Sequence, residues 1–246
     1  MTYAMSDIHG CYDEYKKMLK KINFTDKDRL FVLGDVVDVG KSPAKVLHDM
    51  SMRANVIPIM GNHEYVAYEM LSKLFVELKY TDISKLPPEE ASTLAWEIEE
   101  WVKIGGKSTM DDFRRLPTDE REFLIEYISE FSLYEIVKVK GKTYIMTHAG
   151  LPSGATSKNL DQFDAYDFFV ASVDYEKRYF SDNVFMVTGH LPTYAIDENC
   201  RGIIYRKNNN IAIDVGAGYG GGLGCICLDT FEEFYVLPAG LICLLN

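Results

Sequence analysis

The sequence lacks any long apolar run. No segment of its 246 residues approaches the roughly 20 apolar residues that a membrane-spanning helix needs. The opening residues MTYAMSDIHG also lack a basic stretch followed by an apolar one, so we expect no signal peptide. Basic residues are outnumbered, with 26 Lys and Arg against 37 Asp and Glu and a formal net charge of −11. Nucleic acid and anionic membranes require a basic face, so we expect neither as a partner.

Cysteine is scarce and shows no paired spacing. The chain has five cysteines, an odd number, and no C-x-x-C motif. This pattern argues against a disulfide framework and against a structural zinc site. Reduced core thiols in a cytoplasmic protein are therefore the expectation for Cys11, Cys200, Cys225, Cys227 and Cys243.

The first 65 residues alternate between strand and helix patterns. Apolar runs at 2–5, 29–33 and 55–60 predict strands, and the segments between them have helical spacing. Such alternation indicates parallel strands, whose following loops gather at one edge of a sheet. That edge is where open α/β sheets bind ligands.

The rest of the chain has a different character. Residues 64–130 are charged and helix-forming, and we predict a helical insertion of three or four helices within a single domain spanning 1–246. Trp96 and Trp101 in this segment are expected to pack. From residue 131 short apolar runs with close turns predict a second sheet with antiparallel pairing, and the apolar run at 239–246 predicts a last strand.

Five predicted strands end in Asp, Asn or His, most of them beside glycine. The segments are SDIHG, GDVVD, GNHE, THAG and TGHLPT, and they hold four of the five histidines of the chain. One such His is most often structural, and one such Asp is often only a helix N-cap. Five strand ends together predict a shared site, formed by Asp7, His9, Asp35, Asp38, Asn62, His63, His148 and His190.

This set of side chains is typical of a metal site. Carboxylates gathered so densely would repel one another without cations, whereas two divalent ions would compensate their charge. Imidazole and carboxylate ligands without thiolate suit Mn, our first choice, or Fe, Zn, Co and Ni. Two ions about 3.5–4 Å apart need a bridging carboxylate, and they can assist an in-line displacement at phosphorus. Asp35, central in the series, is the natural bridge.

In this order the motifs resemble those of the calcineurin-like metallophosphoesterases. They are most similar to the phosphoprotein-phosphatase branch, which includes bacterial serine/threonine phosphatases and symmetrical dinucleoside tetraphosphatases. The resemblance runs from residue 6 to about 193, and IAIDVGAGYGGGLGCICLD resembles the closing strands of bacterial members. It implies an α/β fold in which a two-sheet β-sandwich is flanked by helices.

The resemblance also implies roles for the site residues. Six would be metal ligands: Asp7, His9 and His190 at one ion, Asn62 and His148 at the other, and Asp35 bridging both. His63 would protonate the leaving-group oxygen while Asp38 orients and charges its imidazole. A metal-bound hydroxide would then be the nucleophile.

The basic residues that bind phosphate in this family are depleted. Val39 stands where the GDxVDRG motif has arginine, Ser172 replaces a second arginine in a looser alignment, and Gly222 replaces a frequent lysine. No residue is therefore assigned to substrate binding. The candidates that could compensate are Arg114, Arg178, Lys107 and the backbone N–H groups of Gly105 and Gly106.

We predict a metal-dependent phosphatase that hydrolyses phosphomonoesters and resembles the serine/threonine protein phosphatases, with a phosphoprotein or a nucleotide as partner. One alternative is a dinucleoside polyphosphate hydrolase. Another is a degenerate relative that binds metal or a phosphorylated ligand with low turnover because of Val39. The His63–Asp38 pair favours an enzyme, since a binding module needs no acid. A metal-dependent amide or lactone hydrolase would share the ligand types but not the motif order.

Overall fold

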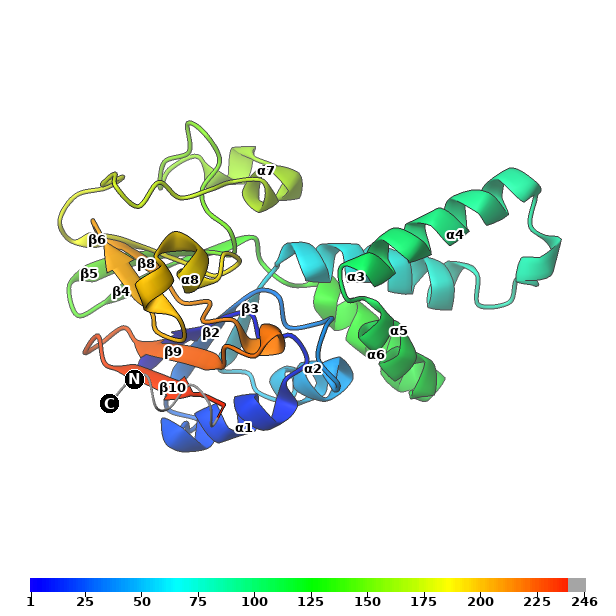
Figure 1. Ribbon diagram of the computed structural model, residues 1–246, viewed down its shortest axis with the longest axis horizontal. Coiled ribbons are helices and arrows are strands. Elements are labelled where there is room, and N and C mark those ends of the chain that lie inside the picture. Colours follow the sequence, from blue (N-terminus) through cyan, green and yellow to red (C-terminus); the bar gives the residue numbers. More distant parts are fainter. Residues whose placement is uncertain (239–246) are drawn as a thin grey trace.

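A computed structural model describes residues 1–238 and shows two five-stranded sheets packed against each other, with helices on their outer sides (Figure 1). The predicted α/β fold with a two-sheet sandwich is confirmed. The strand predicted at 239–246, together with Cys243, lies outside the described residues. The division into one domain with an insertion stays a prediction.

The first sheet has the strand order β10-β9-β1-β2-β3. As predicted, β1, β2 and β3 are parallel, and α1 and α2 connect them. Strands β9 and β10 extend this sheet by antiparallel pairing. The bounds are β1 Thr2–Met5, α1 Tyr12–Lys21, β2 Arg29–Leu33, α2 Pro43–Ser51, β3 Val56–Ile59, β9 Leu223–Cys227 and β10 Glu233–Val236.

The second sheet has the order β4-β5-β6-β8-β7 and differs from the prediction in two ways. Strand β6 is parallel to both β5 and β8, because long connections rather than hairpins precede and follow it. Strands β9 and β10 join the first sheet instead. The bounds are β4 Tyr134–Val139, β5 Lys142–Thr147, β6 Val184–Thr188, β7 Tyr205–Lys207 and β8 Asn210–Ala212.

Alternation of side chains along the strands builds two apolar layers. In β2, Phe31 and Leu33 face the second sheet, where they meet residues such as Val187 and Ile211. Leu30 and Val32 point the opposite way, onto α1 and α2. Because both faces of the first sheet are covered, β1 and β2 are nearly continuous apolar runs, as parallel strands usually are.

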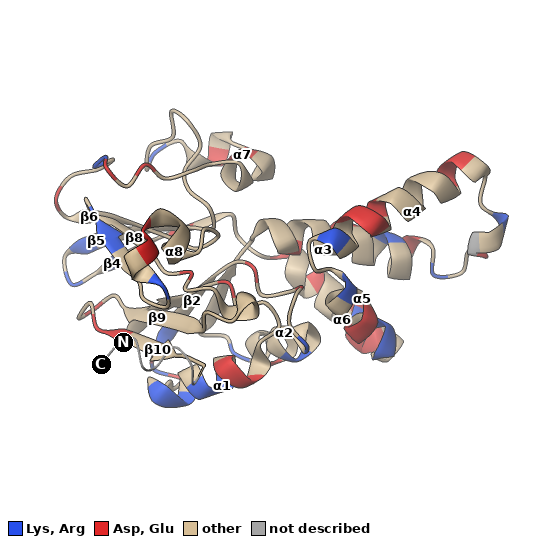
Figure 2. Ribbon diagram, in the orientation of Figure 1, with Lys and Arg blue, Asp and Glu red and all other residues tan. Residues whose placement is uncertain are grey.

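Four α-helices occupy the segment after β3, and α4 projects away from the sheets (Figure 1). Acidic residues are prominent on α4 (Figure 2). Trp101 is 1% exposed and packs as predicted, whereas Trp96 is 61% exposed, so the packing prediction is wrong for Trp96. The elements are α3 Asn62–Ser72, a π-helical turn Lys73–Glu77, a 3₁₀ turn Ile83–Lys85, α4 Pro88–Lys103, α5 Lys107–Arg115 and α6 Thr118–Ser129.

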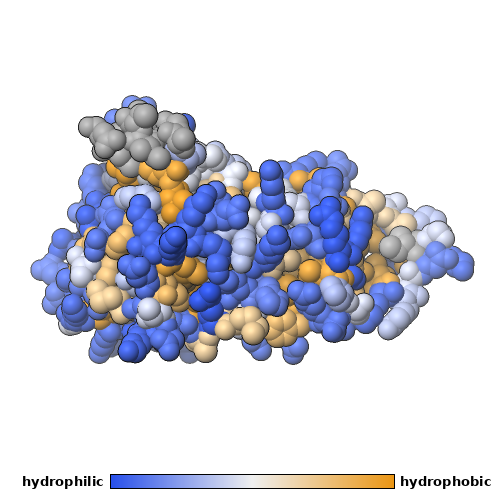
Figure 3. All heavy atoms as spheres, turned by 90° about the horizontal axis from the view of Figure 1, so that it is seen from below, coloured by the Kyte–Doolittle hydropathy of each residue, from blue (hydrophilic) through white to orange (hydrophobic). Residues whose placement is uncertain are grey.

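Short helices complete the fold. They are the 3₁₀ turns Leu160–Gln162, Glu198–Cys200 and Ala217–Tyr219, with α7 Ala165–Phe169 and α8 Thr193–Ile196. The face seen from below is mainly hydrophilic with scattered apolar patches (Figure 3). Within residues 1–238, no helix has both the length and the apolar character needed to cross a bilayer. The four cysteines of this part of the chain are free thiols.

Candidate active site

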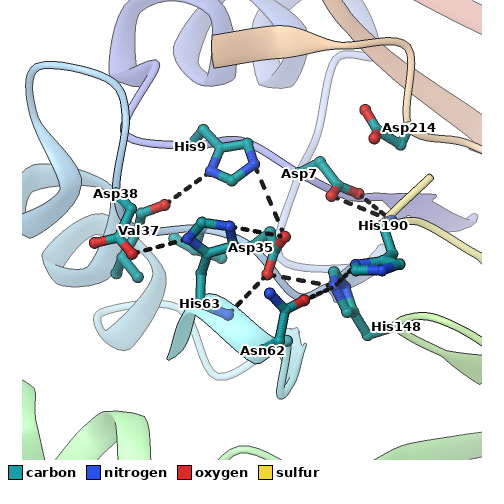
Figure 4. A network of polar contacts seen from close by, with 12 residues as sticks. Asp7, His9, Asp35, Val37, Asp38, Asn62, His63, His148, His190 and Asp214 are labelled. Carbon is teal, nitrogen blue, oxygen red and sulfur yellow. Dashed lines mark hydrogen bonds and ion pairs between the residues drawn. The ribbon is translucent and has the colours of Figure 1, made fainter. Parts of the chain in front are cut away.

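All eight predicted site residues lie together at one edge of the sandwich (Figure 4). Each follows the carboxyl end of a strand: β1, β2 and β3 in the first sheet, β5 and β6 in the second. Six of the eight are buried, Asn62 is half-buried and His190 is exposed. The strand-end pattern therefore located one shared site.

The backbone of this edge is held in an unusual conformation. Positive φ angles are uncommon outside glycine and cluster at functional sites. Five of the eight site residues have them: Asp7, His9, Asp35, Asp38 and His190. The neighbouring glycines are needed for close approach, since a methyl group on Gly61 would lie 2.3 Å from Asp35 Oδ1.

Glu64 is a further site residue to which the sequence assigned no role. Its completely buried carboxylate accepts backbone N–H groups from Asp35, Val36 and Val37 at 2.7, 2.7 and 3.0 Å, and from Gly61 at 3.0 Å. Four hydrogen bonds from two loops fix the position of Asp35. Burial, together with the charge of Asp35, raises the pKa of Glu64 to about 7.

One group of metal-ligand atoms surrounds His148. Its Nδ1 donates to the carbonyl of Leu33 at 2.8 Å, which leaves Nε2 to face Asn62 Oδ1 at 2.9 Å, His190 Nδ1 at 3.1 Å and Asp35 Oδ1 at 3.3 Å. The lone pairs of these nitrogen and oxygen atoms would repel one another, so a cation or a proton has to lie between them. A backbone carbonyl on the far ring nitrogen is also the usual way to orient a metal-ligating histidine. This donor set fits a divalent metal ion.

The second group surrounds His9. Its Nδ1 contacts the carbonyl of Val37 at 3.0 Å, and its Nε2 lies 3.8 Å from Asp35 Oδ2. Asp7 lies beside Asp35 (Figure 4), and burial and the charge of Asp214 raise the pKa of Asp7. Asp35 thus presents one oxygen to each group, as a bridging ligand would.

The position of His190 differs from the predicted grouping. Its ring lies against His148, and only its backbone N–H reaches the His9 group, donating to Asp7 at 3.0 Å. We therefore place the His190 side chain with His148 and Asn62. Spacing along the chain could not decide this, because it does not fix the direction of the side chain.

His63 and Asp38 form the predicted pair. His63 Nδ1 lies 2.8 Å from Asp38 Oδ2, and its Nε2 points toward Asp35. Burial disfavours the charged imidazole, but the hydrogen bond to Asp38 and the charges of Asp35 and Asp38 outweigh it and raise the pKa of His63 to about 9. These contacts favour the charged imidazole, the form that a general acid needs.

Asp214 is a site residue that the sequence pattern could have found. It follows strand β8 in the segment IAID, a further apolar run that ends in a carboxylate. It is 4% exposed, lies near Asp7 and His190 (Figure 4), and accepts the N–H of Gly216 at 2.8 Å. Burial raises its pKa to about 7. When ionised, it adds to the excess of carboxylates that cations would compensate.

The candidates for replacing the missing arginine lie at the surface or are paired elsewhere, and Arg114 is exposed on α5. Lys107 and Arg178 form exposed ion pairs with Asp111 and Asp182. The N–H groups of Gly105 and Gly106 donate to backbone carbonyls of α4, so these two candidates are not free to bind an anion. Val39 itself lies between two glycines, since methyl groups on Gly105 and Gly218 would lie 2.8 and 3.1 Å from its Cγ atoms.

The two-sheet fold and the paired His/Asp donor groups define a metallohydrolase type of site. The chain belongs to the calcineurin-like phosphoesterase family, whose model matches residues 2–221. The family inferred from the five motifs is thereby confirmed.

Two relatives show which members of the family the chain is similar to. Both are symmetrical bis(5'-nucleosyl)-tetraphosphatases. The one from Wigglesworthia glossinidia brevipalpis is 38% identical over 90 residues, which is 35% of this chain and 33% of that protein. The one from Cellvibrio japonicus is 32% identical over 104 residues, which is 42% of this chain and 37% of that protein. The matches thus span about a third of these relatives.

Solved structures confirm the fold over nearly the whole chain. A proposed diadenosine tetraphosphatase superposes with a TM-score of 0.63 at 16% identity, covering 96% of this chain and 92% of that one. A serine/threonine phosphatase from Saccharomyces cerevisiae superposes with a TM-score of 0.59 at 13% identity, covering 96% and 80%. At sequence identities this low, the superpositions establish the fold and not the function.

Proposed function

We propose that this chain is a phosphoesterase that works with two divalent metal ions. The observation that carries the proposal is the position of Asp35, whose two oxygens face separate groups of ligand atoms. Asp7 and His9 would hold one ion, and Asn62, His148 and His190 the other. Bound there, the ions would polarise the phosphoryl group and acidify a water molecule.

The side chains around the ions would perform the remaining chemistry. His63 would donate its proton from Nε2 to the leaving oxygen, and Asp38 would hold the imidazole in place through Nδ1. Glu64 would keep the Asp35 loop rigid, so that its carboxylate does not reorient during the reaction.

Within this class we favour a dinucleoside polyphosphate over a phosphomonoester as substrate, which reverses the order of the two predictions. The relatives named above are one reason. The other is a cavity of about 750 Å³ bordered by Val39 and Gly218, which touch the His9 side of the site. Lys17, Lys41 and Lys45 line it together with Asp13 and Glu14, so its lining is net basic in a chain whose net charge is −11. Such a cavity suits phosphates beyond the one that reacts.

A comparison of substrates tests the proposal. The purified protein, supplied with Mn²⁺, is assayed on a symmetrical dinucleoside tetraphosphate, a phosphoserine peptide and p-nitrophenyl phosphate. We expect turnover of all three, with the highest kcat/KM on the tetraphosphate. A preference for the phosphopeptide would favour the protein-phosphatase alternative, and no turnover of any substrate would favour a binding protein.

The replacement Val39→Arg should raise kcat/KM on p-nitrophenyl phosphate by at least about tenfold, equivalent to ~1.4 kcal/mol. An arginine donates two charge-assisted hydrogen bonds to phosphate oxygens, whereas valine donates none. The change also removes a β-branched residue from a φ of 62°, where such residues are strained. Steady-state kinetics at matched metal content measure the effect. Val39→Gln, unbranched at Cβ but uncharged, is the control, and an equal gain in both variants would contradict a role for the guanidinium.

A further inference from the structure

The Asp38 carboxylate is completely buried and receives hydrogen bonds from three side chains. His63 Nδ1 and Trp101 Nε1 lie 2.8 and 3.2 Å from Oδ2, and Thr109 Oγ1 lies 2.6 Å from Oδ1. Trp101 belongs to α4 and Thr109 to α5, which follow Asp38 by 63 and 71 residues in the chain. Two donors thus come from the helical segment rather than from the strand-end loops.

We propose that Trp101 and Thr109 are positioning residues for proton transfer from His63. They fix the Asp38 carboxylate, which in turn fixes the imidazole. This inference rests on the proposed phosphoesterase function. It assigns the helical segment a part in the chemistry, in addition to its packing against the sheets.

Thr109 holds Asp38 through both its backbone and its side chain. The hydroxyl accepts the Asp38 backbone N–H at 2.8 Å and donates to the carboxylate at 2.6 Å. Asp38 has a φ of 65°, a conformation that a residue other than glycine adopts at a cost. Thr109 is itself completely buried, so these contacts are shielded from bulk solvent.

The turn between α4 and α5 fixes the position of Trp101 relative to the loop that carries Asp38 and Val39. A methyl group on Gly106 would lie 2.3 Å from the Trp101 ring, so the turn packs directly on the indole. The neighbouring carbonyl of Gly105 accepts the N–H of Val39 at 3.1 Å. Two donors and two acceptors of the helical segment, with the Thr109 hydroxyl acting as both, therefore fix Asp38 and Val39 together.

The effect of losing these donors should depend on the leaving group. Hydrogen bonds to ionised groups are stronger than those between neutral groups. Without them, Asp38 can rotate and His63 loses its orientation toward the leaving oxygen. An alkoxide needs a proton as it departs, whereas p-nitrophenolate needs little help.

Three variants test this, each assayed at matched metal content on p-nitrophenyl phosphate and on an alkyl phosphate. Thr109→Val removes the hydroxyl at nearly constant volume, Thr109→Ser keeps it, and Trp101→Phe removes only the indole donor. We expect Thr109→Val and Trp101→Phe to lose at least about tenfold in kcat on the alkyl phosphate and less than about threefold on p-nitrophenyl phosphate. Thr109→Ser should restore the wild-type ratio of the two rates.

Equal losses on both substrates would overturn the inference, because a purely structural role lowers both rates together. A Thr109→Ser variant as impaired as Thr109→Val would also overturn it. If wild type hydrolyses neither substrate, the proposed function itself fails, and the two failures are thereby distinguished. If Thr109→Val does not fold, Trp101→Phe carries the test.

A second readout needs no turnover. In the metal-free protein, the Nδ1 proton of His63 should give a downfield NMR signal that is absent in His63→Asn. We expect this signal to broaden or disappear in Thr109→Val and to persist in Thr109→Ser. A signal unchanged in Thr109→Val would contradict the positioning role.

Discussion

Replacement of Asp35 by asparagine is expected to lower the metal content from about two ions per chain to well below one and to abolish turnover. Burial opposes ionisation of this carboxyl group, but His148, His63 and His9 outweigh it and lower the pKa of Asp35, so the residue is an anion. Asparagine keeps the shape and can still accept the His63 backbone N–H, which lies 3.2 Å from Oδ1. The change therefore removes the charge that a bridging ligand supplies while leaving the loop intact.

Elemental analysis of the dialysed protein measures this effect. Asp161→Asn, which neutralises an exposed carboxylate on a 3₁₀ turn and outside both ligand groups, is the matched control and should keep both ions. Retention of two ions by Asp35→Asn would show that the bridge is assigned to the wrong residue.

His63→Asn is expected to keep its metal and to lose about 10²–10⁴-fold in kcat on alkyl phosphates, the usual contribution of general acid catalysis. The loss on p-nitrophenyl phosphate should be much smaller, because that leaving group departs without a proton. The structural reason is that Nδ1 is already bonded to Asp38 at 2.8 Å, which leaves Nε2 as the proton donor.

Metal content and kinetics together distinguish a general-acid role of His63 from a role as a metal ligand. The Nε2 of His63 is 3.9 Å from Asp35 Oδ2, close enough that a ligand role deserves a direct test. Loss of one ion in His63→Asn would make it a ligand rather than an acid. His48→Asn is the control, since His48 is exposed on α2 and should change neither quantity.

Residues at strand ends could be found from the sequence because the reasoning needs only local patterns. An apolar run that ends in Asp or His beside glycine predicts a site residue, and parallel strands carry such residues to one edge. Asp214 obeys the same rule after β8. The bounds of β1, β2 and β3 could also be predicted from the sequence, because both faces of this sheet are buried and its strands are therefore apolar runs.

Contacts made by the helical segment could not be predicted in this way. Trp101 and Thr109 reach Asp38 from 63 and 71 residues away, and neither spacing nor composition specifies how a helix docks. The grouping of His190 with His148 depends on the direction of one side chain. The second sheet has both parallel and antiparallel pairs because long connections precede and follow β6. Local turn residues do not indicate how strands joined by such connections pair.

The most direct test of the account is the metal dependence of turnover. Protein stripped of metal by a chelator is titrated with Mn²⁺ while p-nitrophenyl phosphate hydrolysis and bound metal are measured together. The account predicts no hydrolysis without metal and a rate that reaches its maximum at about two equivalents per chain. A protein that binds two equivalents and remains inactive, or one that is fully active without metal, would contradict it.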